Sequence, residues 1–311
     1  MNANHPSQAT ARATPLPRIG MLGLGIMGSA MAGNLMRAGF TVLGYDPSAA
    51  ARKRFAAAGG TRCKDPAALA GRVDAVICSL PSAAALHDCA AAIASAAARG
   101  LPVIETSTLA LADKQMAQKT LAARGVVLLD CPLSGTGAQA ARKDLVVYAS
   151  GPRRSIKQLA DVFNGFSRAH YNLGAFGNGM KMKLMANLLV AIHNVSTAEA
   201  LLLGSRWGIK PEDAVRVLSD GAGGSRMLEV RGPVMAERRW QDAAMKVSVW
   251  QKDMQLIAQA LAEAQVPAPL FSATVPLYNA ALGAGHAEHD TAAVFEVLRK
   301  MSSPSGRLGD S

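Results

Sequence analysis

The chain has 311 residues but few aromatic side chains and few cysteines, and both shortages limit what it can be. Phe, Trp and Tyr make up 5% of the sequence while Ala and Gly are abundant, which favours close packing of helices on sheets and on each other. Cys63, Cys78, Cys89 and Cys131 have no CxxC spacing, and no His, Asp or Glu group has metal-site spacing. We therefore expect reduced thiols, a packing role for Cys131, a cytoplasmic protein and no metal.

The sequence also lacks long uninterrupted apolar runs and dense basic runs. Polar residues interrupt the longest apolar stretches, which argues against a membrane span. Residues 1–17 are polar and have no signal-peptide core, so we expect a disordered leader. The net charge is +11, but no five basic residues are consecutive. We therefore expect a surface that attracts anionic substrates and cofactors, and no nucleic-acid binding.

Short apolar segments that fit buried strands alternate with helical segments from residue 18 onwards. Strands are predicted at residues 18–22, 40–45, 75–80, 102–105, 126–130 and 145–149. After about residue 179 only helices are predicted. The chain is thus expected to be α/β, with an N-terminal Rossmann domain built on a doubly wound parallel sheet (residues 18–179) and an all-helical C-terminal domain (residues 180–311).

A glycine-rich turn separates the first predicted strand from the first predicted helix. It has the pattern G-x-G-x-x-G and consists of Gly23, Leu24, Gly25, Ile26, Met27 and Gly28. The glycines permit a tight turn, backbone approach to a pyrophosphate and close helix packing, and the helix start offers free N–H groups. This context predicts a dinucleotide-binding site.

Asp46 ends the next predicted strand and bears on which dinucleotide binds. Its carboxylate can accept hydrogen bonds from a ribose diol and would repel a 2′-phosphate, which favours NAD. Arg52-Lys53-Arg54 could instead reach a phosphate, so NADP remains an alternative.

Three further motifs give the chain a family resemblance. Asp130 to Thr136 is similar to D-x-P-V-S-G-G, and Lys252-Asp253-Met254 is similar to K-D-L. Gly177-Asn178-Gly179 with Lys183 and Asn187 is similar to G-x-G-x-x-x-K-x-x-x-N. From about residue 18 to 300 the chain resembles the β-hydroxyacid dehydrogenase family, which includes 3-hydroxyisobutyrate dehydrogenase and tartronate semialdehyde reductase.

The resemblance implies an NAD(P)-dependent oxidoreductase that interconverts a small 3-hydroxy acid and its aldehyde or keto acid. It implies a long interdomain helix, a C-terminal domain for substrate binding and dimerisation, and a homodimer or homotetramer. It also places Leu80, Pro81 and Thr108 on the nicotinamide side of the cofactor, and Lys252 over the cofactor and the substrate carboxylate.

Lys183 is the candidate general acid and base. A lysine amine desolvated in a cleft near other cations has a lowered pKa and can remove the alcohol proton at neutral pH. Asn187 lies four residues later on the same helix face and can orient Lys183 or bind the substrate hydroxyl. Lys181 is a rival, but two helical residues lie about 200° apart and cannot face one cleft.

The loop of Ser134, Gly135 and Thr136 is predicted to hold a substrate carboxylate with N–H groups and hydroxyls. Thr136 replaces the family's second glycine, and Lys143-Asp144 stand where Gly-Thr is usual, so pocket shape can differ. The polar segment 220–225 hints at a polyhydroxylated acid such as a tartronate- or threonate-like compound.

Two alternatives stay open at this point. The first is an imine reductase-like enzyme of similar fold, which the Lys183-Asn187 pair argues against. The second is a non-catalytic dinucleotide-binding scaffold, which the intact substrate loop argues against.

Overall fold

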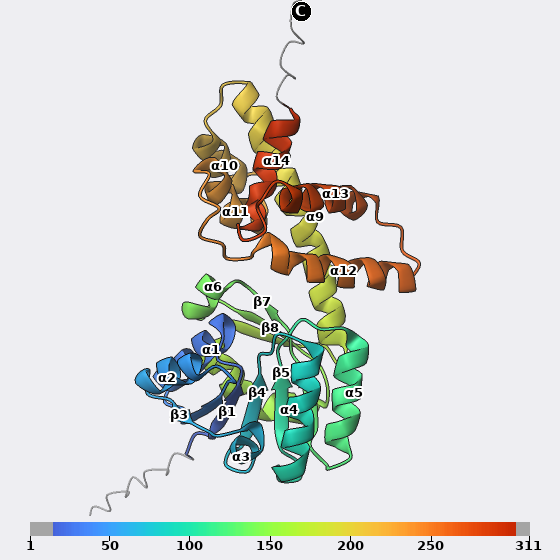
Figure 1. Cartoon of the computed structure of the whole chain (residues 1–311). Helices are drawn as coiled ribbons and strands as arrows, with labels where there is room; N and C mark the ends of the chain where they lie inside the picture. The colour runs from blue at the N-terminus through green and yellow to red at the C-terminus, as the bar shows by residue number, and fades with distance from the viewer. Residues whose placement is uncertain (1–14, 303–311) are drawn as a thin grey trace, which may run out of the picture.

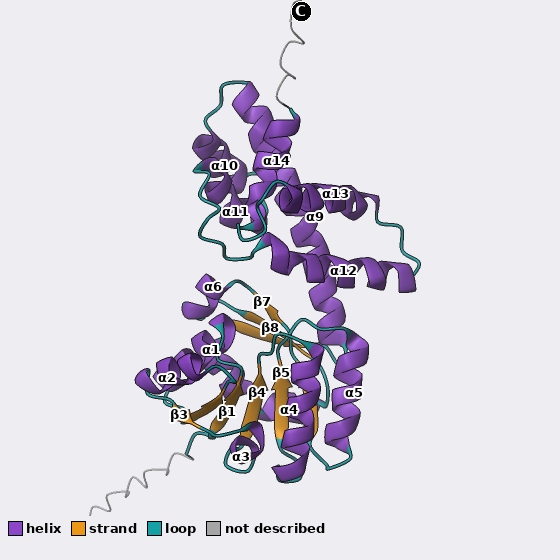
Figure 2. Ribbon diagram, viewed as in Figure 1, coloured by secondary structure: helices purple, strands orange, loops and turns teal. Residues whose placement is uncertain are grey.

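The computed structural model describes residues 15–302, which form two parts joined by one long helix (Figure 1). The N-terminal part is an α/β unit and the C-terminal part is built of helices (Figure 2). Most of the expected leader, residues 1–14, lies outside the described residues.

The main sheet has six parallel strands in the order β3-β2-β1-β4-β5-β6. Their bounds are β1 Ile19–Leu22, β2 Val42–Tyr45, β3 Thr61–Arg62, β4 Ala75–Cys78, β5 Pro102–Glu105 and β6 Val127–Asp130. The order reverses direction between β1 and β4, and the ligands of such sheets bind at the carboxyl ends of strands at this point.

Helices cover both faces of this sheet. They are α1 Ile26–Arg37, α2 Ala49–Ala57, α3 Pro66–Ala70, α4 Ala83–Ala96 and α5 Leu111–Ala122. Because strand side chains alternate, Ile19 and Met21 pack with α1 and α2, whereas Leu22 packs with α3 and α4. Two apolar cores on opposite faces confirm the predicted doubly wound sheet.

A second, smaller sheet follows the main one along the chain. Its strands are β7 Leu133–Ser134, β8 Val146–Ala149 and β9 Ala169–Asn172, and its helices are α6 Gly137–Ala141, α7 Arg153–Gln158 and α8 Ala160–Phe166. β8 pairs antiparallel with β7 and parallel with β9. Only β8 was expected from the sequence, because β7 has two residues and β9 is polar and partly exposed.

The C-terminal part contains seven helical segments among the described residues. They are α9 Asn178–Arg206, α10 Pro211–Asp220, α11 Arg226–Ala236, α12 Val247–Glu263, α13 Pro269–Gly283, η1 Thr291–Ala293 and α14 Val294–Met301. The sequence did not indicate α11, which contains Gly232 and Pro233. α9 runs from the Rossmann part into the helical part, so the domain boundary between residues 179 and 180 stays a prediction (Figure 1).

By length and composition, α9 is the one helix within residues 15–302 that could cross a membrane, with mean hydropathy 1.4 over 18 residues. Of that stretch 39% is buried inside the protein, and α9 carries the buried polar residues Asn187, Asn194 and Thr197. The core helix of a soluble protein has the same properties, so the absence of a membrane span stays a prediction.

Candidate active site

The glycine-rich turn lies between β1 and α1, at the carboxyl edge of the sheet. The Leu24 amide donates a 2.8 Å hydrogen bond to Asp46 Oδ2, and the Ser48 amide donates one of 2.8 Å to Asp46 Oδ1. Asp46 therefore ties the end of β2 to the turn, while each of its oxygen atoms keeps a lone pair for a further donor.

The glycines of this turn differ in what a side chain would meet. A Cβ atom at Gly28 would lie 1.9 Å from the Gly23 carbonyl oxygen, so packing within the protein requires that glycine. A Cβ atom at Gly25 would have no protein atom within 4 Å. The protein itself therefore does not require Gly25, whereas close approach of a pyrophosphate to this backbone would.

The start of α1 supports the same interpretation. Its N-cap residue is Gly25, and no side chain caps the helix. The first N–H groups of a helix have no intrahelical partners and attract anions. The turn, the uncapped helix and Asp46 thus fit the pyrophosphate and ribose of a dinucleotide.

Leu80, Pro81 and Thr108 lie in the loops that follow β4 and β5. The Leu80 amide donates a 2.8 Å hydrogen bond to Ser107 Oγ, which joins the two loops. Lys252 on α12 donates a hydrogen bond from Nζ to the Thr108 carbonyl oxygen. Lys252 therefore connects the helical part of the protein to the edge of the Rossmann sheet.

Four polar residues of α9 and α12 meet near this connection. Asn187 Nδ2 donates a 3.0 Å hydrogen bond to Asp253 Oδ2, and both side chains are buried. Lys252 Nζ lies 3.5 Å from Asp253 Oδ1. Lys183 is half-buried one helical turn before Asn187.

This surrounding changes the acidity of two groups. Burial lowers the pKa of the Lys183 amine, Asp253 opposes that change, and Lys252 adds to it. Burial raises the pKa of Asp253, while Lys252, Lys183 and Asn187 act against the rise. A lower pKa makes the neutral amine, the form that can accept a proton, easier to populate.

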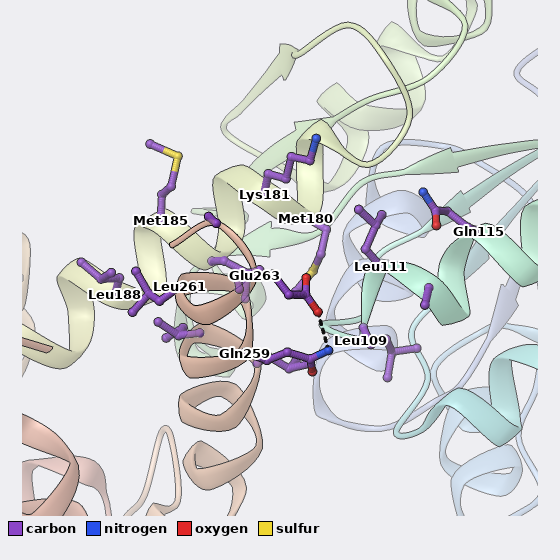
Figure 3. Close-up of a pocket in the computed structure, with 17 residues that line it drawn as sticks. Leu109, Leu111, Gln115, Met180, Lys181, Met185, Leu188, Gln259, Leu261 and Glu263 are labelled. Atoms are coloured by element: carbon purple, nitrogen blue, oxygen red, sulfur yellow. Dashed lines mark hydrogen bonds between the residues drawn. The ribbon is translucent and has the colours of Figure 1, made fainter. Parts of the chain in front are cut away.

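Other polar residues of α9 have separate surroundings. Lys181 is exposed and lines a groove of about 630 Å³ with Met185 and Leu188, where Lys183 takes no part (Figure 3). Asn194 donates 3.0 Å hydrogen bonds to Tyr278 Oη and to the Thr291 carbonyl oxygen in the helical core. Asn194 thus holds α13 and η1 against α9.

The expected carboxylate loop contains β7 and the start of α6. Ser134 belongs to β7, which packs against α9. Thr136 caps α6, because its N–H and hydroxyl bond Gln139 Oε1 and its Oγ1 accepts from the Gln139 amide. The threonine that replaces the family's glycine thus has a local structural role at the start of α6.

The second departure from the family motif is also visible in the structure. Lys143 adopts a φ of 62°, a conformation that favours glycine. Asp144 accepts hydrogen bonds from Gln139 and Arg168, and lies 3.5 Å from Arg226 at the start of α11. This aspartate therefore joins the segment around α6 to the helical part.

Sequence reasoning missed one charged group near the site. Lys114 on α5 is fully buried, and it pairs with Glu105 and Asp130. A signal was present, because Lys114, Ala117 and Leu121 share helical spacing on the buried face of α5.

The cysteines are free and buried, and no cluster of three metal-binding side chains occurs within residues 15–302.

Comparisons with known proteins cover both parts of the chain. Residues 18–198 match the model of the NAD binding domain of 6-phosphogluconate dehydrogenase. Residues 177–298 match the NAD-binding model of NADP-dependent 3-hydroxyisobutyrate dehydrogenase.

Individual relatives align along nearly their whole length. L-threonate dehydrogenase from Cupriavidus necator is 33% identical over 92% of this chain and 97% of its own. The crystal structure of 3-hydroxyisobutyrate dehydrogenase from Salmonella typhimurium is 29% identical, covers 90% of this chain and 99% of its own, and has a TM-score of 0.80.

A structure of imine reductase from Pseudomonas sp. is 20% identical over 91% of this chain and 99% of its own, with a TM-score of 0.58. At that identity it shares the fold alone, so the dehydrogenase interpretation is favoured over the imine reductase alternative. The chain belongs to the β-hydroxyacid dehydrogenase family of NAD(P)-dependent oxidoreductases.

Proposed function

We propose that the protein is an NAD-dependent dehydrogenase of a small 3-hydroxy acid, with a polyhydroxylated four-carbon acid of the L-threonate type as substrate. The relative from Cupriavidus necator carries the name L-threonate dehydrogenase. The observation that carries the proposal is the half-buried Lys183 amine, with its lowered pKa, beside Asn187 and Asp253.

Lys183 acts as general base when the alcohol is oxidised. Its neutral amine accepts the hydroxyl proton, and its ammonium returns a proton to the oxygen in the reverse reaction. Burial and the charge of Lys252 both favour the neutral amine. Positioned proton transfer of this kind contributes about 10²–10⁴-fold to the rate.

Asn187 and Asp253 orient this site. Because Asn187 Nδ2 is engaged by Asp253 Oδ2, its amide oxygen is left to accept a hydrogen bond from Lys183 or the substrate hydroxyl. Asp253 is buried at 5% exposure, so the pair holds a defined geometry.

The glycine-rich turn and the start of α1 hold the pyrophosphate, and Asp46 binds the ribose diol. When bound, the nicotinamide accepts the hydride during oxidation and returns it during reduction. Arg52 donates to the carbonyl oxygens of Asp46 and Pro47 and stacks over Tyr45. This engagement of Arg52, one of the three basic residues that could reach a 2′-phosphate, supports NAD over NADP.

The substrate carboxylate is held by Ser134, Gly135 and Lys252. Ser134 lies on the strand packed against α9, and Lys252 Nζ faces the loop after β5 through the Thr108 carbonyl oxygen. A carboxylate at Lys252 gains a charge-assisted hydrogen bond.

We also propose a cytoplasmic homodimer or homotetramer. Met185 and Leu189 are one turn apart on α9 and are 61% and 50% exposed. Met185 borders the groove between α5, α9 and α12, and that groove is lined mostly by apolar side chains (Figure 3). Contiguous exposed apolar surface of this kind marks interfaces between subunits.

Lys183→Ala tests the function, with Lys181→Ala as its matched control on the same helix. We expect Lys183→Ala to lose about 10²–10⁴-fold in kcat for hydroxy acid oxidation while binding NAD normally. Lys181→Ala should retain activity. A wild-type protein that binds NAD but turns over none of a panel of C3–C4 hydroxy acids would instead be a scaffold.

A further inference from the structure

Three buried charges lie between the sheet and the first turn of α9. Glu105 ends β5, Asp130 ends β6, and Lys114 reaches both from α5. Lys114 Nζ lies 2.7 Å from Glu105 Oε2 and 2.8 Å from Asp130 Oδ1, and all three side chains are 0% exposed. Charges buried this deeply persist only when they are paired and hydrogen-bonded, so the cluster has a fixed geometry.

One arm of the cluster holds the start of α9. Asp130 Oδ2 accepts hydrogen bonds from the Met180 amide at 2.8 Å and from Ser150 Oγ at 3.1 Å. Ser150 Oγ in turn accepts from the Gly179 amide at 2.9 Å. The helix's own N-cap, Gly177, has no side chain, so Asp130 and Ser150 satisfy its first N–H groups.

The capping requires the backbone of α9 at Gly179 to lie close to the backbone of β6 and β8. A Cβ atom at Gly179 would lie 2.3 Å from the Tyr148 carbonyl oxygen and 2.6 Å from that of Asp130. Lys183 follows Met180 by three residues, on the next turn of the same helix. The position of Asp130 therefore sets where α9 begins and where Lys183 projects.

The other arm holds the loops after β4 and β5. Glu105 Oε1 accepts a 2.8 Å hydrogen bond from the Ser107 amide. Ser107 Oγ accepts a 2.8 Å hydrogen bond from the Leu80 amide. Thr108, which anchors Lys252, is the next residue.

We propose that Glu105, Lys114 and Asp130 form a positioning network, in which the Asp130 arm places Lys183 and the Glu105 arm places the loops at Leu80 and Thr108. The inference rests on the proposed role of Lys183. The two carboxylates share one ammonium ion, so Lys114 joins the two arms, while each carboxylate holds its own arm through its second oxygen atom.

Asp130→Asn and Glu105→Gln test the two arms by the same acid-to-amide change. Neutralising either carboxylate leaves one buried carboxylate paired with the Lys114 ammonium. Because no buried charge is then left without a partner, we expect both variants to fold. Asp74→Asn is the matched control, because Asp74 forms an exposed ion pair with Arg18 and precedes β4 at the opposite edge of the sheet. Amide hydrogen exchange in the ligand-free protein, the affinity for NAD, and kcat against pH are measured for each.

For Asp130→Asn we expect exchange at residues 178–186 about tenfold faster and kcat at least about tenfold lower, with a displaced pH profile, because misplacement of a reacting group is costly. For Glu105→Gln we expect NAD binding about tenfold weaker and unchanged exchange at residues 178–186. Asp74→Asn should match wild type. Folded Asp130→Asn with wild-type exchange and kcat, or identical effects of both variants, would overturn the network.

Ser150→Ala provides a second variant if Asp130→Asn does not fold, since it removes the acceptor for the Gly179 amide and a donor to Asp130 but keeps all three buried charges. It should still accelerate exchange at the start of α9 and lower kcat, and wild-type values would overturn the proposal. Should Lys183→Ala remain active, the proposed function fails, while the exchange data still report whether Asp130 holds α9.

Discussion

Asn187 and Asp253 are separated by 66 residues in the chain, yet a 3.0 Å hydrogen bond joins their side chains between α9 and α12. Asp253 Oδ1 is buried without a hydrogen-bond partner among the described residues, although Lys252 lies 3.5 Å away. The carboxylate therefore depends on Asn187 for its side-chain hydrogen bond.

Asn187→Ala should lower both kcat and stability, because it leaves a buried carboxylate without its donor. The expected loss in the free energy of unfolding is about 1–3 kcal/mol. Asn194→Ala is the control on the same helix, where the lost hydrogen bonds go to Tyr278 and Thr291. It should destabilise the protein but leave kcat of the folded enzyme unchanged, and a comparable fall in kcat would contradict the role of Asn187.

The rate of alcohol oxidation should rise with pH and level off above the pKa of Lys183. Only the neutral amine can accept the proton, and burial places that pKa below the ordinary lysine value of about 10.4. Because Lys252 lowers the pKa of Lys183 and Asp253 raises it, Lys252→Met should move the profile to higher pH and Asp253→Asn to lower pH. Measured kcat against pH checks both directions, and shifts of the same sign would refute the assignment.

Gly25→Ala and Gly28→Ala should separate cofactor binding from packing. The first adds a methyl group into open space, so stability should hold while NAD affinity falls by at least about tenfold. The second places a methyl group against the Gly23 carbonyl oxygen and should cost about 1–3 kcal/mol in stability. Thermal unfolding and NAD titration distinguish the two, and normal NAD binding by Gly25→Ala would remove the proposed pyrophosphate contact.

Asp46→Ser should shift cofactor preference from NAD towards NADP. It removes the acceptor proposed for the ribose diol and the charge that would repel a 2′-phosphate, together worth about 1.5–3 kcal/mol. The ratio of kcat/KM for the two cofactors measures the change. Because Asp46 also accepts from the Leu24 amide, thermal unfolding must accompany the measurement. An unchanged ratio in a folded variant would point to a different determinant of preference.

Leu189→Glu should shift the assembly towards smaller species in light scattering. A charge placed on an apolar interface loses solvation without gaining a partner. Ser196→Glu adds the same charge at an exposed position of α9 and should leave the mass unchanged. Equal masses for wild type and Leu189→Glu would show that this face is not an interface.

The sequence by itself determined the α/β order, the glycine-rich turn and the helical C-terminal half. These depend on local periodicity and on glycines within a few residues of each other, and the structure bears out the fold class. The sequence did not predict the short strands β3 and β7 or the helix α11. A strand of two residues is too short to show an alternating pattern, and Gly232-Pro233 interrupts the helical pattern of α11.

Only the tertiary structure decided how the charged side chains pair. Lys114 meets Asp130 and Asn187 meets Asp253 because helices pack onto a twisted sheet and onto each other, which brings together residues far apart in the chain. Residue types alone do not specify such partners. A buried polar group must find its hydrogen-bond partner within the protein, and the packing of the helices and the sheet decides which group lies within reach. The sequence likewise predicted a ligand-binding role for Thr136, and only the structure showed that this residue also caps α6.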